Sequence, residues 1–410
     1  MDLKRILNGY SLNIPKSEEQ PKMEPSPKKD IDYVMPGKEV SNEHGKYYMI
    51  ENLYPLSYFY GGVRFENLFD MNNEVFTCLS GNGCLDVNKM IFVDTETTGL
   101  SSGSGTIPFL IGTGKIQKDG FCVKQYFMRD YNEEAAVLYD LTQILQNAES
   151  VVTYNGKSFD MPLINTRFIA NRFRLDTTGL VHLDLLHIAR LFWKGYFENC
   201  RLCTIEEKIL GEIRIDDIPG EKIPLEYFRY LDTRDATVMG QVIKHNLYDI
   251  LSLAALLVRF STMVSNRNNV DNINELYGLS KLYEKCDDYI SVIECLERTM
   301  QINTGDWNIE TVKRISMFYK RTGRYDKAVE MWNCYYYSDN CPSLGLKVFV
   351  GTELAKYFEH KIKEYRQALF VVNNLLSHVR GKSFLGRIYL NDLEKRRKRL
   401  ERIICNLKTV

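Results

Sequence analysis

The pattern of hydrophobic and polar positions is clearest in the middle of the chain. Residues 89–93 form a short apolar run with β-branched and aromatic members, which predicts a buried strand. Two more strands are predicted at 107–116 and 121–128, and the Gln-Lys-Asp-Gly stretch between them is typical of a hairpin. Residues 132–146 have Ala, Leu and Ile at helical spacing, and 150–154 has the composition of a fourth strand.

The segment that follows is predicted to be mainly helical. Pro162 stands near the start of one expected helix, where proline is tolerated. Further helices are expected at 184–194, 204–210 and about 235–258. Three strands, a helix, a strand and several helices predict an α/β domain with a mixed sheet flanked by helices, which we place at 89–262.

Beyond about residue 265 the strand-like runs end, and Tyr, Leu, Lys and Glu recur at helical spacing. Residues 279–296 resemble 315–332, and 353–372 repeats the theme after a slightly longer interval. Helix pairs with a period of about 34–40 residues are typical of α-solenoids. We therefore predict an all-α helical-repeat domain over 263–410 that ends in a strongly basic helix.

The N-terminal part has weaker signals. Pro, Lys, Glu and Ser dominate residues 1–40 without periodicity, which predicts a flexible arm. Residues 41–88 contain aromatics and a Gly-Gly pair, and we expect a lead-in of short strands and turns.

Charge changes this picture in one respect. The 410 residues include 53 Lys and Arg and 53 Asp and Glu, so the formal net charge is zero. This excludes a histone-like basic protein and an acidic disordered one. The total hides a basic C-terminal third, because residues 261–410 contain 25 basic and 18 acidic residues.

Cysteines and apolar runs bear on location. Of the ten cysteines only Cys200 and Cys203 form a C-x-x-C pair, which predicts reduced thiols rather than a zinc site. The first residues have no apolar core of a secretory signal, and the longest apolar run, around Ile250–Val258, is too short to span a bilayer. We expect a cytoplasmic protein without membrane association.

Two acidic residues end the first predicted strand of the α/β domain. Asp94 and Glu96 are two positions apart, so their side chains project from the same face. Two carboxylates held close together are unfavourable unless a positive charge lies between them, and a divalent cation meets that need. The short pattern is common by itself; its position at the end of an apolar strand makes it significant.

Two further elements supply candidate partners. Asp160 follows the fourth strand and opens a helix, where an Asp can also serve only as a cap. His245 and Asp249 are four positions apart and share one helix face, where they can also form only a mutual pair. Taken together, four carboxylates suit two Mg²⁺ or Mn²⁺ ions, and a nearby His suits proton transfer from water.

The motifs DTETTG (94–99), NGKSFD (155–160) and HNLYD (245–249) resemble those of the DEDD superfamily of 3′–5′ exonucleases, which has a ribonuclease H-like fold. The resemblance is close to the YprB-like branch and covers roughly 89–260, and the repeats behind it resemble tetratricopeptide-like (TPR-like) ones. It implies metal-dependent 3′→5′ removal of nucleotides. Carried over by position, the metal ligands would be Asp94, Glu96, Asp160 and Asp249, and the general base would be His245.

The chain departs from the superfamily at one point. Members with a catalytic His usually place it five positions before the last Asp, where this chain has Lys244. His245 instead has the spacing of members with a catalytic Tyr. Thr97 and Asn155 are candidate substrate contacts, although Asn155 can equally be a structural turn residue. Glycines 112 and 114 are interpreted as turn glycines.

These observations predict a two-metal exonuclease acting on DNA or RNA, with a single-stranded 3′ end as the expected substrate and a protein partner on the repeats. One alternative is a nucleic-acid-binding or scaffold protein whose nuclease fold is weakly active or silent. Another is an endonuclease of the ribonuclease H type, which dependence on a free end would distinguish.

Overall fold

The computed structural model describes residues 29–81, 85–99, 105–302, 309–338, 341, 343–380 and 384–407. They form two compact units. The first runs through Phe76 and continues with Asn82–Ile188 and Cys200–Phe260, and the second comprises Thr77–Gly81, Ala189–Asn199 and the chain from Ser261 onward.

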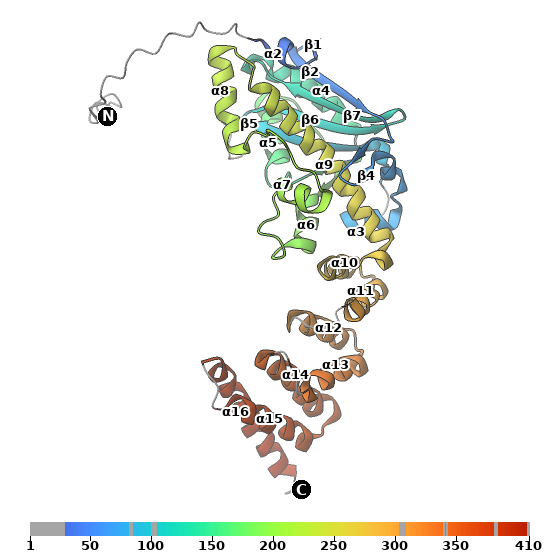
Figure 1. Ribbon diagram of the computed structural model, residues 1–410, viewed down its shortest axis with the longest axis vertical. Helices are drawn as coiled ribbons and strands as arrows, with labels where there is room; N and C mark the ends of the chain where they lie inside the picture. The colour runs from blue at the N-terminus through green and yellow to red at the C-terminus, as the bar shows by residue number, and fades with distance from the viewer. Residues whose placement is uncertain are drawn as a thin grey trace, which may run out of the picture. The chain divides into compact units, whose positions relative to one another are not determined.

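A mixed sheet organises the first unit, as the sequence predicts, and it has seven strands where four were predicted (Figure 1). Its order is β1-β2-β7-β6-β5-β8-β9. The pairs from β1 to β5 are antiparallel, whereas β5–β8 and β8–β9 are parallel. The strands are β1 (Lys38–Asn42), β2 (Gly45–Tyr54), β5 (Met90–Thr97), β6 (Pro108–Gln117), β7 (Gly120–Phe127), β8 (Ser150–Thr153) and β9 (Val181–Asp184). A separate small hairpin joins β3 (Phe59–Tyr60) to β4 (Val63–Arg64).

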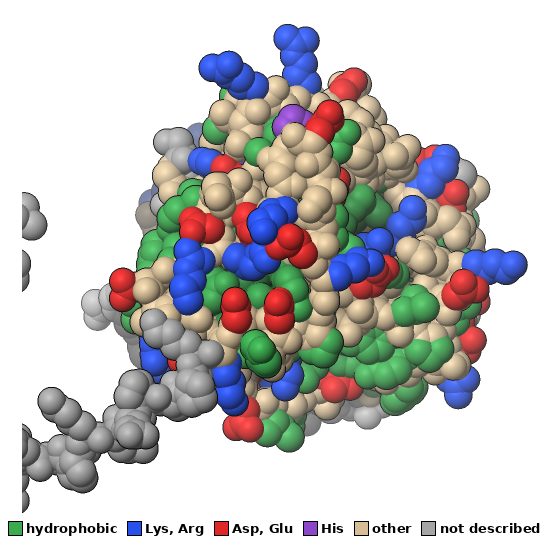
Figure 2. All heavy atoms as spheres, turned by 90° about the horizontal axis from the view of Figure 1, so that it is seen from above, with side chains coloured by type: hydrophobic (Ala, Val, Ile, Leu, Met, Phe, Trp, Pro, Cys, Tyr) green, Lys and Arg blue, Asp and Glu red, His purple; other side chains and the backbone are tan. Residues whose placement is uncertain are grey.

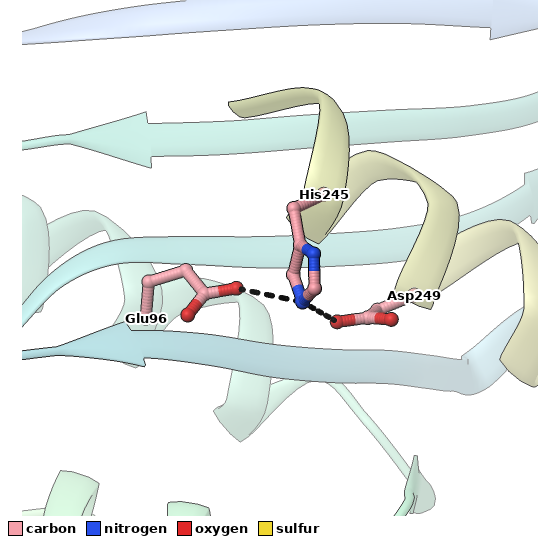
Figure 3. A group of neighbouring side chains, drawn as sticks. All are labelled: Glu96, His245 and Asp249. Carbon is pink, nitrogen blue, oxygen red and sulfur yellow. Dashed lines mark ion pairs between the residues drawn. The ribbon is translucent and has the colours of Figure 1, made fainter. Parts of the chain in front are cut away.

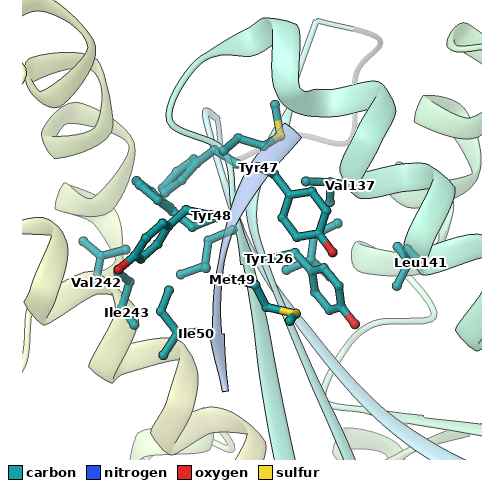
Figure 4. Packing of buried hydrophobic residues seen from close by; sticks show 14 of the residues in the cluster. Tyr47, Tyr48, Met49, Ile50, Tyr126, Val137, Leu141, Val242 and Ile243 are labelled. Atoms are coloured by element: carbon teal, nitrogen blue, oxygen red, sulfur yellow. The ribbon is translucent and has the colours of Figure 1, made fainter. Parts of the chain in front are cut away.

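Helices flank this sheet, with α4 (Glu134–Gln146) on one face and α9 (Met239–Ser265) on the other (Figure 4). The other helices before α9 are α2 (Ile31–Val34), α3 (Asn73–Ser80), α5 (Asp160–Ala170), α6 (Leu185–Trp193), α7 (Leu202–Ile205) and α8 (Ile223–Thr233). Successive side chains of β2 point to opposite faces, as the pleat requires. In Figure 4, Tyr48 and Ile50 lie on the side of α9, while Tyr47 and Met49 lie on the side of α4. The sheet is therefore buried on both faces.

The sheet begins earlier in the chain than residue 89. Strands β1 and β2 come from residues 38–54, and β2 pairs with β7 from Tyr48 to Tyr54. Residues 1–28 of the expected flexible arm lie outside the described residues. The rest of that segment is folded, because residues 31–34 form α2 and Ile31 is 1% exposed.

Helix α9 is long and apolar enough to cross a membrane by length and composition, but 78% of its apolar window is buried inside the protein. Two glycines of β6 let it approach the sheet. A Cβ atom at Gly112 would lie 2.3 Å from Oδ1 of Asn246, and one at Gly114 would lie 2.7 Å from a methyl carbon of Ile250. The interpretation of Gly112 and Gly114 as turn glycines was wrong: both lie within a strand, and their missing side chains admit the helix.

The second unit is all-helical beyond α9, as predicted, and successive helices pack on one another. Three turns between helices contain a residue of positive φ, at Asp287, Gly323 and Lys363. These turns fall inside the three self-similar segments, in keeping with a helical repeat; the TPR-like type stays a prediction. The helices are α10 (Ile273–Lys285), α11 (Tyr289–Ile302), α12 (Ile309–Arg321), α13 (Tyr325–Tyr337), α14 (Leu344–Tyr357), α15 (Tyr365–Val379) and α16 (Phe384–Leu407).

Candidate metal centre

Strand β5 places two carboxylates at its carboxyl end. Asp94 and Glu96 are partly exposed, whereas Thr95 and Thr97 beside them are buried. This alternation puts the two acids on one face of the strand, as their spacing predicts. β5 lies between β6 and β8, but β8 pairs only with Met90–Phe92. The two acids therefore pair with β6 on one side and lie beyond the end of the β8 pairing on the other.

Asp160 joins the site from the first residue of α5, which follows β8. Its side chain is buried, with 5% of the residue exposed. The hydroxyl of Thr95 donates a hydrogen bond to Oδ1 of Asp160 over 2.5 Å. A residue of β5 thus fixes the orientation of the α5 carboxylate.

Helix α9 brings the third part of the site. His245 and Asp249 lie on the same helix face, and Nε2 of His245 is 3.6 Å from Oδ2 of Asp249 and 4.0 Å from Oε1 of Glu96 (Figure 3). Between them Asn246, which is fully buried, donates from Nδ2 to Oδ2 of Asp94 over 2.9 Å. The helix therefore contacts both acids of β5.

The electrostatics of this cluster favour a bound cation. Burial, together with the neighbouring carboxylates Asp249 and Asp160, raises the pKa of Asp94 and of Glu96 well above the usual range. Burial also raises the pKa of Asp160 to about 6, against the opposing hydrogen bond from Thr95. A positive charge among these oxygens would remove the penalty of ionising them.

Glu96, His245 and Asp249 offer ligand atoms that all lie within 4.8 Å of one another. Carboxylate oxygens are the ligands that hard divalent cations prefer, and an imidazole nitrogen is acceptable to Mn²⁺. The donor set of this cluster fits such an ion. Asp94 and Asp160 adjoin the cluster through their electrostatic coupling to Asp249.

A buried cation from the chain itself, Arg214, reaches the site, and the sequence analysis missed it. Its guanidinium, 8% exposed, pairs with the buried Glu206 over 2.5 Å and makes a short contact with Oδ1 of Asp249. A third partner, Asp217, is 3.4 Å away. Arg214 therefore neutralises part of the acidic cluster. Its only sequence signal was that it lies within the region, roughly 89–260, that resembles the family.

Asp217 is the second residue that the sequence analysis did not assign. Its Oδ1 is 2.8 Å from Nδ1 of His245, and its Oδ2 is 3.0 Å from the same nitrogen. A carboxylate on Nδ1 favours a proton on that nitrogen and fixes the plane of the ring. Nε2 is then left facing Glu96 and Asp249.

The two predicted substrate contacts have structural partners. The hydroxyl of Thr97 donates to the carbonyl of Gly99 over 2.7 Å. Asn155 has a left-handed backbone, with φ of 67°, and its N–H donates to Oδ1 of Asp184 over 2.8 Å. Asp184 also accepts from the N–H of Lys157 over 3.0 Å, so this buried carboxylate fastens the turn that leads to Asp160. Substrate contacts by Thr97 and Asn155 stay predictions.

Comparison with known proteins agrees with this architecture. Residues 91–261 match a family model of the RNase_H superfamily. The chain is also 34% identical over 334 residues to the uncharacterized protein YprB of Bacillus subtilis (strain 168), which covers 79% of each protein. The chain belongs to the YprB family. An RNase H-like fold usually binds divalent metals and implies nucleic-acid binding, so for this YprB-family chain the fold and the acidic cluster together indicate a nuclease.

Proposed function

We propose that the protein is a 3′→5′ exonuclease that hydrolyses phosphodiester bonds of DNA or RNA with two Mg²⁺ or Mn²⁺ ions. The observation that carries the proposal is the convergence of Glu96, His245 and Asp249 from β5 and α9, with ligand atoms within 4.8 Å of one another. Asp94 and Asp160 complete the proposed ligand set of four carboxylates, and His245 is the proposed general base. Burial and neighbouring carboxylates raise the pKa of Asp94 and of Asp160, and bound cations would stabilise the ionised form of both side chains.

In the proposed reaction the carboxylates and His245 have different roles. Asp94, Glu96, Asp160 and Asp249 would hold the ions, which when bound stabilise charge on the attacking and leaving oxygens. Nε2 of His245 would accept a proton from the attacking water, because its other nitrogen is engaged by Asp217. The position of His245, four residues before Asp249, thus suits a general base that a distant carboxylate orients.

The test is a cleavage assay on the full-length protein. Single-stranded DNA and RNA carrying a 5′ label would be incubated with Mn²⁺ and then Mg²⁺. We expect a ladder that shortens from the 3′ end, and we expect Asp94→Asn/Glu96→Gln to abolish it. Glu207→Gln, which removes an exposed carboxylate outside the cluster, is the matched control and should cleave normally. Cleavage of a circular strand would instead indicate an endonuclease.

Arg214 favours a second candidate function. Its contact with Asp249 already places a positive charge on one proposed ligand. A protein in which this pair persisted would bind nucleic acid with a weakly active or silent nuclease site. Binding of both oligonucleotides without cleavage in either metal would support this candidate and refute the exonuclease.

A further inference from the structure

The second unit contains a cavity of about 640 Å³ between α12, α14 and α16. Its lining is cationic, with five Lys and Arg residues and two acidic ones. By contrast, the face of the protein in Figure 2 mixes acidic and basic side chains. We define the basic cavity by six lining residues: Lys313, Phe349, Lys356, Tyr389, Lys395 and Arg399.

Two buried carboxylates pair with some of these cations, but they do not cancel the positive charge. Glu353, 4% exposed, pairs with Lys320 over 2.5 Å and with Lys356 over 2.6 Å. Burial alone would raise its pKa, but hydrogen bonds from both lysines hold the pKa below the usual range. One carboxylate shared by two cations leaves a net positive charge, and of the two cations Lys356 lines the cavity.

The second buried carboxylate is also shared by two cations, which are arginines of α16. Glu359, 2% exposed, pairs with Arg396 over 2.7 Å and makes a short contact with Arg399. Lys313 and Lys395 add further charge, and no buried carboxylate among the described residues pairs with either. The cavity lining and its ion-pair partners together have a net charge of +3, from six cations (Lys313, Lys320, Lys356, Lys395, Arg396 and Arg399) and three acids (Glu353, Glu359 and Asp392). The positive excess is built into the helix packing and fits an anionic ligand.

Aromatic side chains in the cavity indicate which class of anion it would bind. Phe349 and Tyr389 line the cavity, and Nζ of Lys313 is 5.5 Å from the ring centroid of Phe349. Cations interleaved with aromatic faces suit phosphates and the bases attached to them, whereas an acidic peptide would use only the charges. A volume of about 640 Å³ is within the usual range of ligand sites.

We propose that the basic cavity is a second nucleic-acid site, at which phosphates of a single strand meet Lys313, Lys395 and Arg399 and a base stacks on Phe349 or Tyr389. This inference rests on the proposed function for the identity of the anion, but not on catalysis. The site would hold the strand independently of the metal centre.

The experiment is equilibrium binding of fluorescein-labelled single-stranded DNA and RNA 20-mers to the full chain, followed by anisotropy. All proteins would carry Asp94→Asn/Glu96→Gln, so that no strand is cut. The test variant is Lys313→Ala/Lys395→Ala, which spares the buried ion pairs. The control is Lys285→Ala/Lys327→Ala, which removes equal charge from exposed positions of the same unit outside the cavity.

We expect the cavity variant to bind about tenfold more weakly at 0.1 M salt and its salt slope to fall by about 1.4, the value for two lost phosphate contacts. The control should stay within about twofold of its parent. Equal losses in both variants, or a loss in neither, would overturn the proposal. Displacement of the strand by poly-glutamate at equal charge concentration would overturn it in favour of an acidic peptide.

A second measurement does not depend on a variant. A single strand containing 4-thiouridine should crosslink to peptides of α12, α14 or α16 in the silent parent, and crosslinks confined to the first unit would refute the cavity. Failure of the exonuclease proposal is distinguishable, because it would appear as absent cleavage in the unsubstituted protein while cavity-dependent binding persisted.

Discussion

Replacing Asp160 by Asn should stabilise the metal-free protein, because it removes one charge from a crowded acidic cluster. Folding raises the pKa of this carboxyl from 3.8 to about 6, so the folded state favours its protonated form. Below about pH 4 the carboxyl is protonated in both the folded and the unfolded state and costs no stability; as pH rises through about 6, its ionisation lowers the free energy of unfolding. Above that pH the loss is ~3 kcal/mol, because the pKa is raised by about two.

The hydrogen bond from Thr95 reduces the gain. Its 2.5 Å bond to the carboxylate would become a bond to a neutral amide oxygen, which is weaker by about 1 kcal/mol. The net gain at pH 8 is then ~2 kcal/mol, or about 4–8 °C in Tm for a domain of this size. At pH 5 roughly half of the ionisation penalty remains, and the gain shrinks to ~0.5 kcal/mol.

The assay is thermal unfolding at pH 5 and pH 8, in EDTA and in Mn²⁺. In EDTA at pH 8 the variant should melt above the unsubstituted protein, and in Mn²⁺ the order should reverse, because the variant lacks a proposed ligand. Asp140→Asn is the control: this carboxylate accepts the hydroxyl of Tyr47 over 2.6 Å outside the cluster, so its loss should destabilise. No gain in EDTA, or an equal gain at both pH values, would refute the reasoning.

Three further predictions concern the surroundings of the cluster. Asp217→Asn should lower kcat by about 10–100-fold while KM and Mn²⁺ affinity change less than about threefold, since its closer side-chain partner is His245, at 2.8 Å, and its contact with Arg214 is longer, at 3.4 Å. A proportional loss of metal affinity in calorimetry would contradict this role. Arg214→Met should destabilise by ~3–5 kcal/mol because it leaves Glu206 buried without its partner, and denaturant titration should show recovery when Glu206→Gln is added. Gly112→Ala should cost about 1–3 kcal/mol and weaken Mn²⁺ binding, because the added Cβ displaces α9; unchanged binding would show that the helix tolerates the shift.

Local patterns were sufficient for most elements of the first unit. Strands β5, β6, β7 and β8 and helices α4 and α9 lie where apolar runs and helical spacing predicted them. Each signal comes from a single continuous segment whose buried face repeats with a fixed period. No element was predicted for β9, a strand of four residues, or for α8, a helix of 11 residues.

Membership of the sheet could not be read from the sequence. Residues 38–54 have ordinary strand composition, but only the register of β2 against β7 shows that they extend the main sheet. The glycines of β6 posed the same problem. Gly112 has no turn signal of its own, and its role depends on Asn246, far along the chain, packing against it.

Some residues of the candidate site could be recognised in the sequence, and others only in the structure. The five proposed residues could be picked out in the sequence, because carboxylates at a strand end and at helical spacing are recognisable within short motifs, and their roles stay predictions. Tertiary structure alone decided that Arg214 reaches Asp249, 35 positions away, and that Asp217 reaches His245, 28 positions away. Charged side chains on a loop have no periodicity, and their partners are fixed only when packing brings two distant segments together out of water.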